Sequence, residues 1–330
     1  MRGDLVRRLI RMVRPSPRAD LEGLVRRLVS RRSTRACLNL VYNRLSPAQK
    51  ETFYSLFAKI FREHPQAVAA GEWWVRVGDR WAALPLDGHD TWLEWDLALS
   101  LLGHEVEIKH TYLDLIRFRR PKLFFDIGAN YGLHSTLFLL HGIPTVSFEP
   151  NPRCHQYFRK LTERNRVPGA LQPVALGATE GWADISFPER DTWLGSTNPA
   201  VVEQVTRTHG GQVTSVRVAQ TSVDVFVRRD GRHPDLIKVD TEGNEAAVLE
   251  GARETLATCR PWVIFESWRD TERDTLGAFF EELDYRICAL PLHLPRPPMV
   301  LEKKQLRDWP TTNLIALPIQ DLERVFHFCE

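Results

Sequence analysis

The sequence contains no apolar run long enough to cross a membrane and no paired cysteines. A spanning helix needs roughly 18 or more consecutive apolar residues, and charged residues interrupt every window of that length. The 5 cysteines lie far apart, without the paired spacing of a zinc site or a disulfide framework. These absences exclude a membrane-spanning protein and a disulfide-stabilised miniprotein, and they favour a reducing cytoplasm.

The chain outside its first 35 residues has no net positive charge. The 330-residue chain has a net charge of +2, while residues 1–35 hold eleven Arg against three acids, so this segment carries +8 and the remainder −6. No nucleic-acid partner is expected for a body of that charge. Residues 1–35 also show two apolar stripes at helical spacing, which predicts a basic amphipathic arm. It packs on the protein itself, or it makes a peripheral contact with a partner protein or with the inner face of a membrane.

Residues 36–115 are predicted to form a smaller subdomain of helices and a hairpin. Ser46 followed by Pro47 is typical of a helix start. Residues 72–86 alternate around Gly78 and Asp79 as a β-hairpin does. Tryptophans concentrate in this flank, either as core between subdomains or as a wall of a substrate pocket. We expect the flank to cover the cofactor or substrate of a larger domain at residues 116–330.

After residue 120, short apolar runs alternate with helical stretches. This alternation predicts an α/β fold with a largely parallel, doubly wound sheet. Residues 182–219 interrupt the rhythm and indicate an inserted hairpin with a long loop near residues 192–211. Residues 285–290 and 313–317 indicate two late strands that pair antiparallel at the edge of the sheet. The strand-like runs are residues 123–127, 145–148, 171–175, 236–239 and 263–265.

Ligands of an open parallel sheet bind beyond the carboxyl ends of its strands. The first strand is followed by Asp126, Gly128, Asn130 and Gly132, a spacing that fits neither the dinucleotide fingerprint nor a Walker loop. An acid beside a glycine loop favours a ligand that carries an amine. Glu149 ends the second strand, where a carboxylate accepts the hydroxyls of a ribose. S-adenosylmethionine satisfies both acids, whereas the alternative makes Asp126 a helix cap and Glu149 a surface carboxylate.

Three sequence blocks in this order resemble the FkbM-type family of S-adenosylmethionine-dependent methyltransferases, over roughly residues 100–318. The resemblance implies a Rossmann-like domain whose seven-stranded, mostly parallel sheet has helices on both faces and an antiparallel last strand. It also implies methylation of a hydroxyl in a sugar, polyketide or similar metabolite. Where the family often has a Leu-Asp pair, this chain has Val223-Asp224 after Ser222. The blocks are Phe125-Asp126-Ile127-Gly128-Ala129-Asn130-Tyr131-Gly132, Phe148-Glu149-Pro150-Asn151-Pro152, and Ile237-Lys238-Val239-Asp240-Thr241-Glu242-Gly243-Asn244-Glu245 with Val248-Leu249-Glu250-Gly251-Ala252.

The same resemblance assigns the cofactor contacts. The loop after the first strand surrounds the methionine part, Glu149 holds the ribose, and Val174 and Ala175 flank the adenine. With Ser135 in the first helical turn, the predicted cofactor-binding residues are Asp126, Gly128, Asn130, Gly132, Ser135, Glu149, Val174 and Ala175.

Methyl transfer to an alcohol benefits from a base, because a protonated hydroxyl is a poor nucleophile. The candidate catalytic residues are Asp240 and Glu242 after the fourth strand, Glu266 at the end of the fifth, and His134 at the start of the first helix. Asp240 is the first choice, since a strand-end carboxylate faces the ligand edge of the sheet. Its rival role is to bind the cofactor's ammonium or a divalent metal, with Glu242 and Glu245 as further oxygen ligands. Glu245 has its own alternative, which is to stabilise the start of a helix.

The sequence as a whole predicts a cytoplasmic S-adenosylmethionine-dependent O-methyltransferase that acts on a sugar-containing or polyhydroxylated metabolite. One alternative is an N-methyltransferase of similar fold, in which the acceptor amine depends less on a base. The other is a cofactor-fold binding module that its basic arm attaches to a membrane or to an envelope-polymer assembly.

Overall fold

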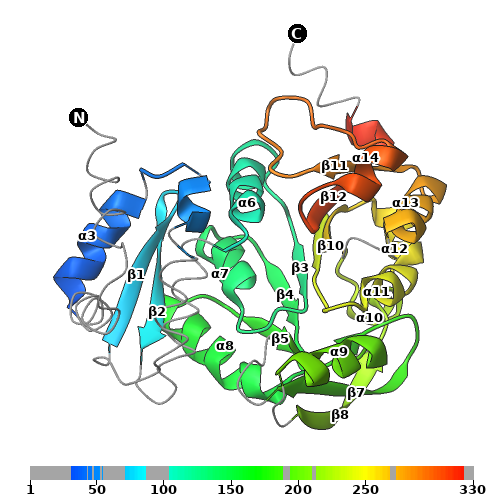
Figure 1. The fold of residues 1–330 in the computed structure, drawn as a ribbon, viewed down its shortest axis with the longest axis horizontal. Helices are drawn as coiled ribbons and strands as arrows, with labels where there is room; N and C mark the ends of the chain where they lie inside the picture. Colours follow the sequence, from blue (N-terminus) through cyan, green and yellow to red (C-terminus); the bar gives the residue numbers. More distant parts are fainter. Residues whose placement is uncertain are drawn as a thin grey trace. The chain divides into compact units, whose positions relative to one another are not determined.

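A computed structural model describes most of the chain, and its elements fall into two compact units, residues 1–104 and 105–330 (Figure 1). No helix within the described segments has the length and apolar character to cross a bilayer. The described residues are 31–42, 44–46, 48–52, 54, 71–86, 104–188, 194–209, 213–267 and 273–322. The predicted arm therefore lies almost entirely outside the described residues.

The described part of the first unit is a helix packed on a two-stranded antiparallel sheet. The elements are α3 (Arg32–Tyr42), β1 (Gly71–Val77) and β2 (Arg80–Leu86). The side chains of Arg35 and Asn39 donate to the carbonyls of Glu72 and Trp74 in β1. These hydrogen bonds give partners to two carbonyls of an edge strand, which would otherwise be open to pairing with another strand. The predicted hairpin is thus confirmed, with Gly78 in its turn at φ +60°.

The predicted helix start at Ser46 is also confirmed. The Gln49 amide donates to Ser46 Oγ at 3.4 Å, and the Ser46 amide donates to Gln49 Oε1 at 2.9 Å. This reciprocal pair is a capping box. The tryptophans at 92 and 95 and the predicted end of this helix near residue 65 lie outside the described residues.

A seven-stranded sheet forms the centre of the second unit, in the order β11-β12-β10-β9-β3-β4-β5. Its strands pair in parallel from β10 through β5, while β12 runs antiparallel to both of its neighbours. This confirms the predicted α/β, Rossmann-like sheet with its antiparallel last strand. The strands are β3 (Phe124–Ile127), β4 (Thr145–Phe148), β5 (Ala170–Gln172), β9 (Leu236–Val239), β10 (Trp262–Glu266), β11 (Tyr285–Ala289) and β12 (Asn313–Pro318).

Helices cover both faces of this sheet because neighbouring strand residues point to opposite sides. Phe124 of β3 packs against Tyr112 of α6 and Phe138 of α7, whereas the adjacent Phe125 packs against Phe226 of α10. The helices are α6 (Val106–Phe118), α7 (Leu133–Leu140), α8 (Pro152–Asn165), α10 (Val223–Asp230), α11 (Glu245–Glu250), α12 (Arg253–Cys259), α13 (Arg273–Glu282) and α14 (Lys303–Asp308).

Helix α6 gives a domain boundary that differs from the one placed between residues 115 and 116. The two compact units divide between His104 and Glu105, so α6 belongs with the sheet. The reason is packing: Tyr112 is 1% exposed and its ring contacts Phe124 and Phe138.

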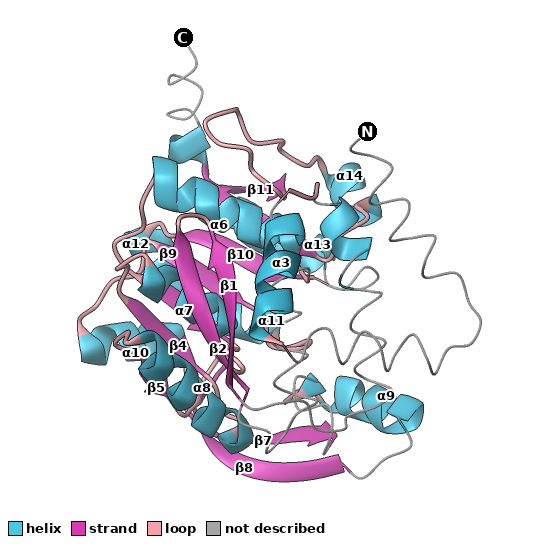
Figure 2. Ribbon diagram, turned by 90° about the vertical axis from the view of Figure 1, so that its left-hand side faces the viewer, coloured by secondary structure: helices cyan, strands magenta, loops and turns pink. Residues whose placement is uncertain are grey.

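The predicted insertion is a hairpin, with two differences from the sequence interpretation. Strands β7 (Gly181–Pro188) and β8 (Val213–Thr221) pair antiparallel, and α9 (Pro199–His209) lies in what was predicted to be a long loop. Figure 2 shows α9 beside this curved hairpin. The predicted third strand also divides, because its end, β6 (Ala175–Leu176), pairs with β8 in a separate three-stranded sheet.

Candidate functional site

The first strand of the sheet ends in a buried acid that the following helix holds in place. Asp126 is fully buried, and Ser135 in the first turn of α7 donates to its Oδ2 at 2.5 Å. The Ser135 hydroxyl also lies 2.7 Å from that of Ser147 in β4. Within the described residues, Asp126 Oδ1 has no hydrogen-bond partner. Ser135 therefore contacts the acid directly and fixes its orientation.

Gly128 lets this loop pass very close to the neighbouring strand end. Its φ is +78°, and a β-carbon there would lie 1.7 Å from the carbonyl oxygen of Asp240. Only glycine permits both this conformation and this approach. The loop after β3 and the loop after β9 are thereby brought into contact, together with the acids that they carry. Gly132 has a similar φ of +82° and faces Phe158.

Glu149 follows β4 and binds the same loop. Its Oε2 accepts from the amide of Asn130 at 2.7 Å, and its Oε1 accepts from the amide of Asn151 at 2.7 Å. Each carboxylate oxygen keeps capacity for a further hydrogen bond. Burial raises the pKa of Glu149 to about 7, against the opposing effect of the two amides, and the charges of Asp126 and Asp240 add to the rise. Asp126 and Glu149 thus meet at one edge of the sheet, as predicted.

The two residues predicted to flank the adenine lie beyond the end of β5. Val174 is partly buried and packs against the main core. Ala175 is 4% exposed, belongs to β6, and packs with the core of the smaller sheet. Their predicted contact with the adenine stays a prediction.

A buried lysine lies among the acids of this edge. Lys238 of β9 is 1% exposed, and its Nζ lies 2.7 Å from Asp240 Oδ2. Burial alone would lower the pKa of Lys238, but Asp240, Glu105 and Asp126 outweigh it and hold the pKa above its ordinary value. The ammonium is therefore charged, and it neutralises part of the surrounding negative charge.

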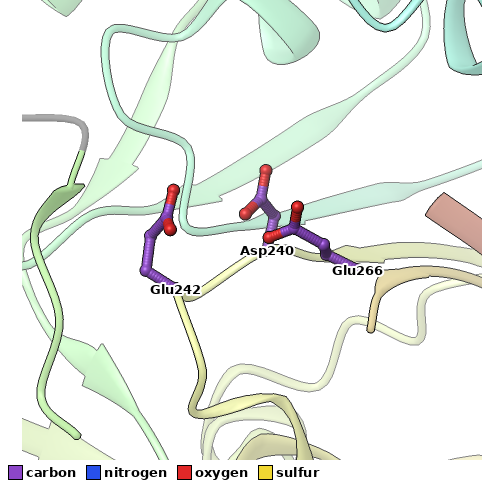
Figure 3. A group of neighbouring side chains, drawn as sticks. All are labelled: Asp240, Glu242 and Glu266. Carbon is purple, nitrogen blue, oxygen red and sulfur yellow. The ribbon is translucent and has the colours of Figure 1, made fainter. Parts of the chain in front are cut away.

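Three carboxylates converge where β9 and β10 end. Asp240, Glu242 and Glu266 each offer an oxygen within 4.8 Å of the others, and Figure 3 shows their carboxylates turned toward one another. Burial raises the pKa values of Glu242 and Glu266, and the charge of Asp240 raises them further. Such a group can share a proton, take one from a hydroxyl, or coordinate a divalent cation. We call Asp240, Glu242 and Glu266 the carboxylate cluster.

Glu245 is not a member of this cluster. It is the first residue of α11, and its Oε1 accepts from the amides of Thr241 and Gly243 at 2.7 and 3.3 Å. The predicted alternative, stabilisation of the helix start, is therefore what these contacts provide. Glu266, from the next strand, takes the place in the cluster that the metal hypothesis had given to Glu245.

His134 lies between α6 and the sheet edge with both ring nitrogens engaged. Its Nε2 lies 3.1 Å from Glu105 Oε2, and its Nδ1 lies 3.1 Å from the hydroxyl of Tyr112. Neither nitrogen is left to accept a proton from a ligand without breaking one of these contacts. The ring instead orients Glu105, a residue in the left-handed conformation at φ +47°.

Sequence reasoning gave no role to Lys238 or to the residues of the insertion that contact this edge. Ser196 donates to the carbonyl of Glu242, and Asn198 donates to the carbonyl of Gly243. For Lys238 a signal was present, because a lysine within an apolar strand is rarely buried without a partner. For Ser196 and Asn198 nothing in their local sequence indicated a contact more than forty residues away.

Among the described residues at this edge of the sheet, acids outnumber cations. The carboxylates include those of Asp126, Glu149 and the carboxylate cluster, and Lys238 is a buried cation among them. An environment of this sign favours a cationic ligand. Asp126, with its unpartnered oxygen, and Glu149, with its remaining acceptor capacity, fit an amine and a pair of ribose hydroxyls. The residues present are therefore suited to S-adenosylmethionine.

Comparison with known proteins identifies the domain that carries this site. The family model of the methyltransferase FkbM domain matches residues 126–288. The hexuronic acid methyltransferase AglP of Haloferax volcanii is 29% identical over 136 residues, which cover 41% of this chain and 51% of that protein. The chain thus spans about half the length of that relative. The methyltransferase sdnD of Sordaria araneosa is 27% identical over 211 residues, covering 56% of this chain and 80% of that protein.

Among solved structures, a methyltransferase FkbM from Methylobacillus flagellatus matches 69% of this chain and 54% of that chain, at 13% identity and a TM-score of 0.39. The family match begins at the acid that ends β3 and includes the glycine loop, Glu149 and the carboxylate cluster. This chain therefore contains a methyltransferase FkbM domain, which occupies residues 126–288.

Proposed function

We propose that this protein is an S-adenosylmethionine-dependent O-methyltransferase whose acceptor is a hydroxyl of a saccharide or another polyhydroxylated metabolite. The observation that carries the proposal is the carboxylate cluster, which lies beside the predicted cofactor loop within a methyltransferase FkbM domain. A methyl acceptor that is a hydroxyl needs a group to take its proton, and the cluster supplies one.

The cofactor would be held by the first two strand ends. When bound, it supplies a methyl group already activated by the positive charge of its sulfonium. Glu149 accepts the ribose hydroxyls, and Asp126 with the loop from Gly128 to Gly132 surrounds the methionine part. The negative charge of this edge of the sheet favours the sulfonium and the ammonium together.

Within the carboxylate cluster, the geometry divides the roles. Asp240 is paired with Lys238 at 2.7 Å, so one of its carboxylate oxygens already accepts from an ammonium. Burial raises the pKa values of Glu242 and Glu266, so each is a stronger base once ionised, and its ionised form becomes more populated as the pH rises. We therefore propose that Glu242 and Glu266 take the proton of the acceptor hydroxyl, and that Asp240 orients the acceptor. His134 and Tyr112 position Glu105.

The acceptor class rests on one relative. The name of the Haloferax volcanii protein specifies a hexuronic acid as its substrate, and a polyhydroxylated ring presents hydroxyls that neighbouring carboxylates can hold. We infer a small-molecule or saccharide acceptor for this chain, and no nucleic acid. An amine acceptor, the alternative of N-methylation, would need no cluster with raised pKa values.

The first test is calorimetric binding of S-adenosylhomocysteine to the intact protein and to Glu149→Ala. We expect micromolar binding by the intact protein and at least a tenfold loss in the variant. Absence of binding to the intact protein would overturn the proposal.

The second test measures S-adenosylhomocysteine release with a panel of methyl glycosides, including a glucuronoside, a glucoside and an amino sugar. Glu242→Gln and Glu266→Gln should each slow transfer at least a hundredfold, while Glu250→Gln, an exposed acid of α11 paired with Arg253, serves as the matched control. If both variants still methylate the amino sugar, the result would instead support N-methylation. Dialysis against EDTA tests for a metal. If it abolishes transfer and Mg²⁺ restores it, the cluster binds a cation rather than acting as a base.

A further inference from the structure

The loop that carries Glu242 is held in an unusual conformation. It joins β9 to α11, and Glu242 lies in the left-handed region at φ +54°, followed by Gly243 at φ +92°. A residue with a β-carbon adopts this conformation only where surrounding contacts impose it. The contacts that impose it here come from two directions.

The first direction is the β7–β8 insertion. Ser196 Oγ donates to the carbonyl of Glu242 at 2.7 Å, and Asn198 Nδ2 donates to the carbonyl of Gly243 at 2.7 Å. These residues lie more than forty positions from the loop along the chain. The backbone of Glu242 itself is thus anchored by a side chain of the insertion.

Ser196 and Asn198 are themselves fixed within the insertion. Ser196 is 1% exposed, and its backbone exchanges two 3.0 Å hydrogen bonds with Ser186 of β7. Asn198 Oδ1 accepts from the backbone amide of Ala200 at 3.0 Å, so Asn198 caps α9. The backbone amide of Asn198 donates to Ser196 Oγ at 3.0 Å. The two donors therefore form one rigid unit with β7 and the start of α9.

The insertion also restricts the loop sterically. A β-carbon on Gly243 would lie 2.7 Å from Val201 Cγ2 of α9. On the other side, Glu245 Oε1 accepts from the amides of Thr241 and Gly243. The loop is held between α9 and the start of α11, and the side chain of Glu242 leaves it toward Asp240 and Glu266 (Figure 3).

We propose that Ser196 and Asn198 are positioning residues for methyl transfer, which act by fixing the Glu242 backbone so that its carboxylate stays in the carboxylate cluster. This inference rests on the proposed function for the role of Glu242. It gives the insertion a part in the chemistry, because the hairpin and α9 determine where the acceptor's proton is taken.

One test needs no acceptor. In the protein without ligand, Ser196→Ala should speed hydrogen–deuterium exchange of the amides at residues 241–244 at least tenfold. Asn198→Asp, which keeps the oxygen that caps α9 and loses the amide donor to Gly243, should do the same. Ser186→Ala is the matched control, because the Ser186 side chain bonds Ser215 and not the loop. Unchanged exchange in both variants would overturn the proposal.

The second test is a double-mutant cycle on the best acceptor of the glycoside panel. Ser196→Ala should lower kcat about tenfold, leave the Kd of S-adenosylhomocysteine within twofold, and be rescued by Ser196→Thr. In a Glu242→Gln background it should have less than a twofold further effect, because residues that act through one another are not additive.

The outcomes separate two failures. Equal tenfold losses in both backgrounds would show that Ser196 does not act through Glu242, and would overturn the positioning role while the methyltransferase proposal stands. Full transfer by Glu242→Gln alone would instead remove Glu242 from the chemistry, and with it both the assigned base and the inference built on it.

Discussion

At the scale of single residues, the protonation of Glu149 decides how the predicted cofactor site responds to pH. This carboxyl is 6% exposed, and burial raises its pKa to about 7 despite the two amides that donate to it. The hydroxyls of a ribose donate to the ionised form, so binding favours loss of the proton. Below pH 7 the ligand-free protein must therefore lose the Glu149 proton when it binds the ligand, whereas above pH 7 the carboxylate is already formed.

We expect the Kd of S-adenosylhomocysteine to fall as pH rises, by up to about tenfold per unit below pH 7, with a plateau at higher pH. Calorimetry between pH 5.5 and 8.5 measures this dependence. In Glu149→Gln the affinity should be weaker and nearly independent of pH over the same range. A slope that persists in this variant would show that another group controls binding.

Glu149 could be located from the sequence because its pattern is local. It is a carboxylate at a strand end, at a set distance after a glycine loop. The same local reasoning placed Asp126 and Asp240 at strand ends. It made Asp240 the first choice of base, whereas our proposal ranks Glu242 and Glu266 above it. That ranking depends on the 2.7 Å contact between Lys238 and Asp240 and on burial, neither of which a strand-end position specifies.

At the scale of elements, the close approach of two strand ends determines the shape of the site. The loop after β3 passes over the end of β9, and Gly128 leaves no room for a side chain beside the Asp240 carbonyl. A substitution there disturbs both loops at once. Gly231, which ends α10, has nearly the same φ, +76° against +78°, but nothing lies within 4 Å of its β position.

We expect Gly231→Ala to cost about 1 kcal/mol, the strain of the left-handed conformation alone. Gly128→Ala should cost at least about 3 kcal/mol more and abolish S-adenosylhomocysteine binding, because backbone atoms must move to admit the methyl group. Urea unfolding and calorimetry of the two variants make the comparison. Equal costs would mean that the loops separate without penalty.

Regular alternation made the parallel strands and their connecting helices predictable, and turn chemistry made the hairpin of β1 and β2 predictable. Helix α9 was missed because its sequence is rich in Val and Thr, which favour strands. Its cap at Asn198 and its contact with Gly243 outweigh that preference. The division of the predicted third strand was missed because β6 forms only by pairing with β8, more than forty residues later.

At the scale of the whole molecule, the predicted cofactor-binding residues and the carboxylate cluster all belong to the second unit, residues 105–330. Among the described residues, the hydrogen-bond partners of Asp126, Glu149 and Asp240 come from within residues 105–330. The predicted part of the first unit is to cover the cofactor or substrate.

We therefore expect a chain that starts at residue 105 to bind S-adenosylhomocysteine within about threefold of the intact protein, and to lose at least tenfold in transfer to the best glycoside. Calorimetry and product release measure the two quantities, and the thermal transition of the shortened chain controls for its folding. Full transfer by the shortened chain would assign acceptor recognition to residues 105–330 alone.

The sequence by itself determined the class of fold, the glycine loop and the acids at the strand ends. These features depend on residues that lie close together in the sequence: apolar runs of strand length, helices between them, and polar residues directly after each strand. Only the tertiary structure decided which acids meet. Glu266 joins Asp240 and Glu242 from a neighbouring strand, Glu245 turns back to its own helix start, and Ser196 reaches Glu242 from the insertion. These contacts join residues 24 to 46 positions apart, or depend on which way a side chain turns, and a linear pattern contains neither kind of information.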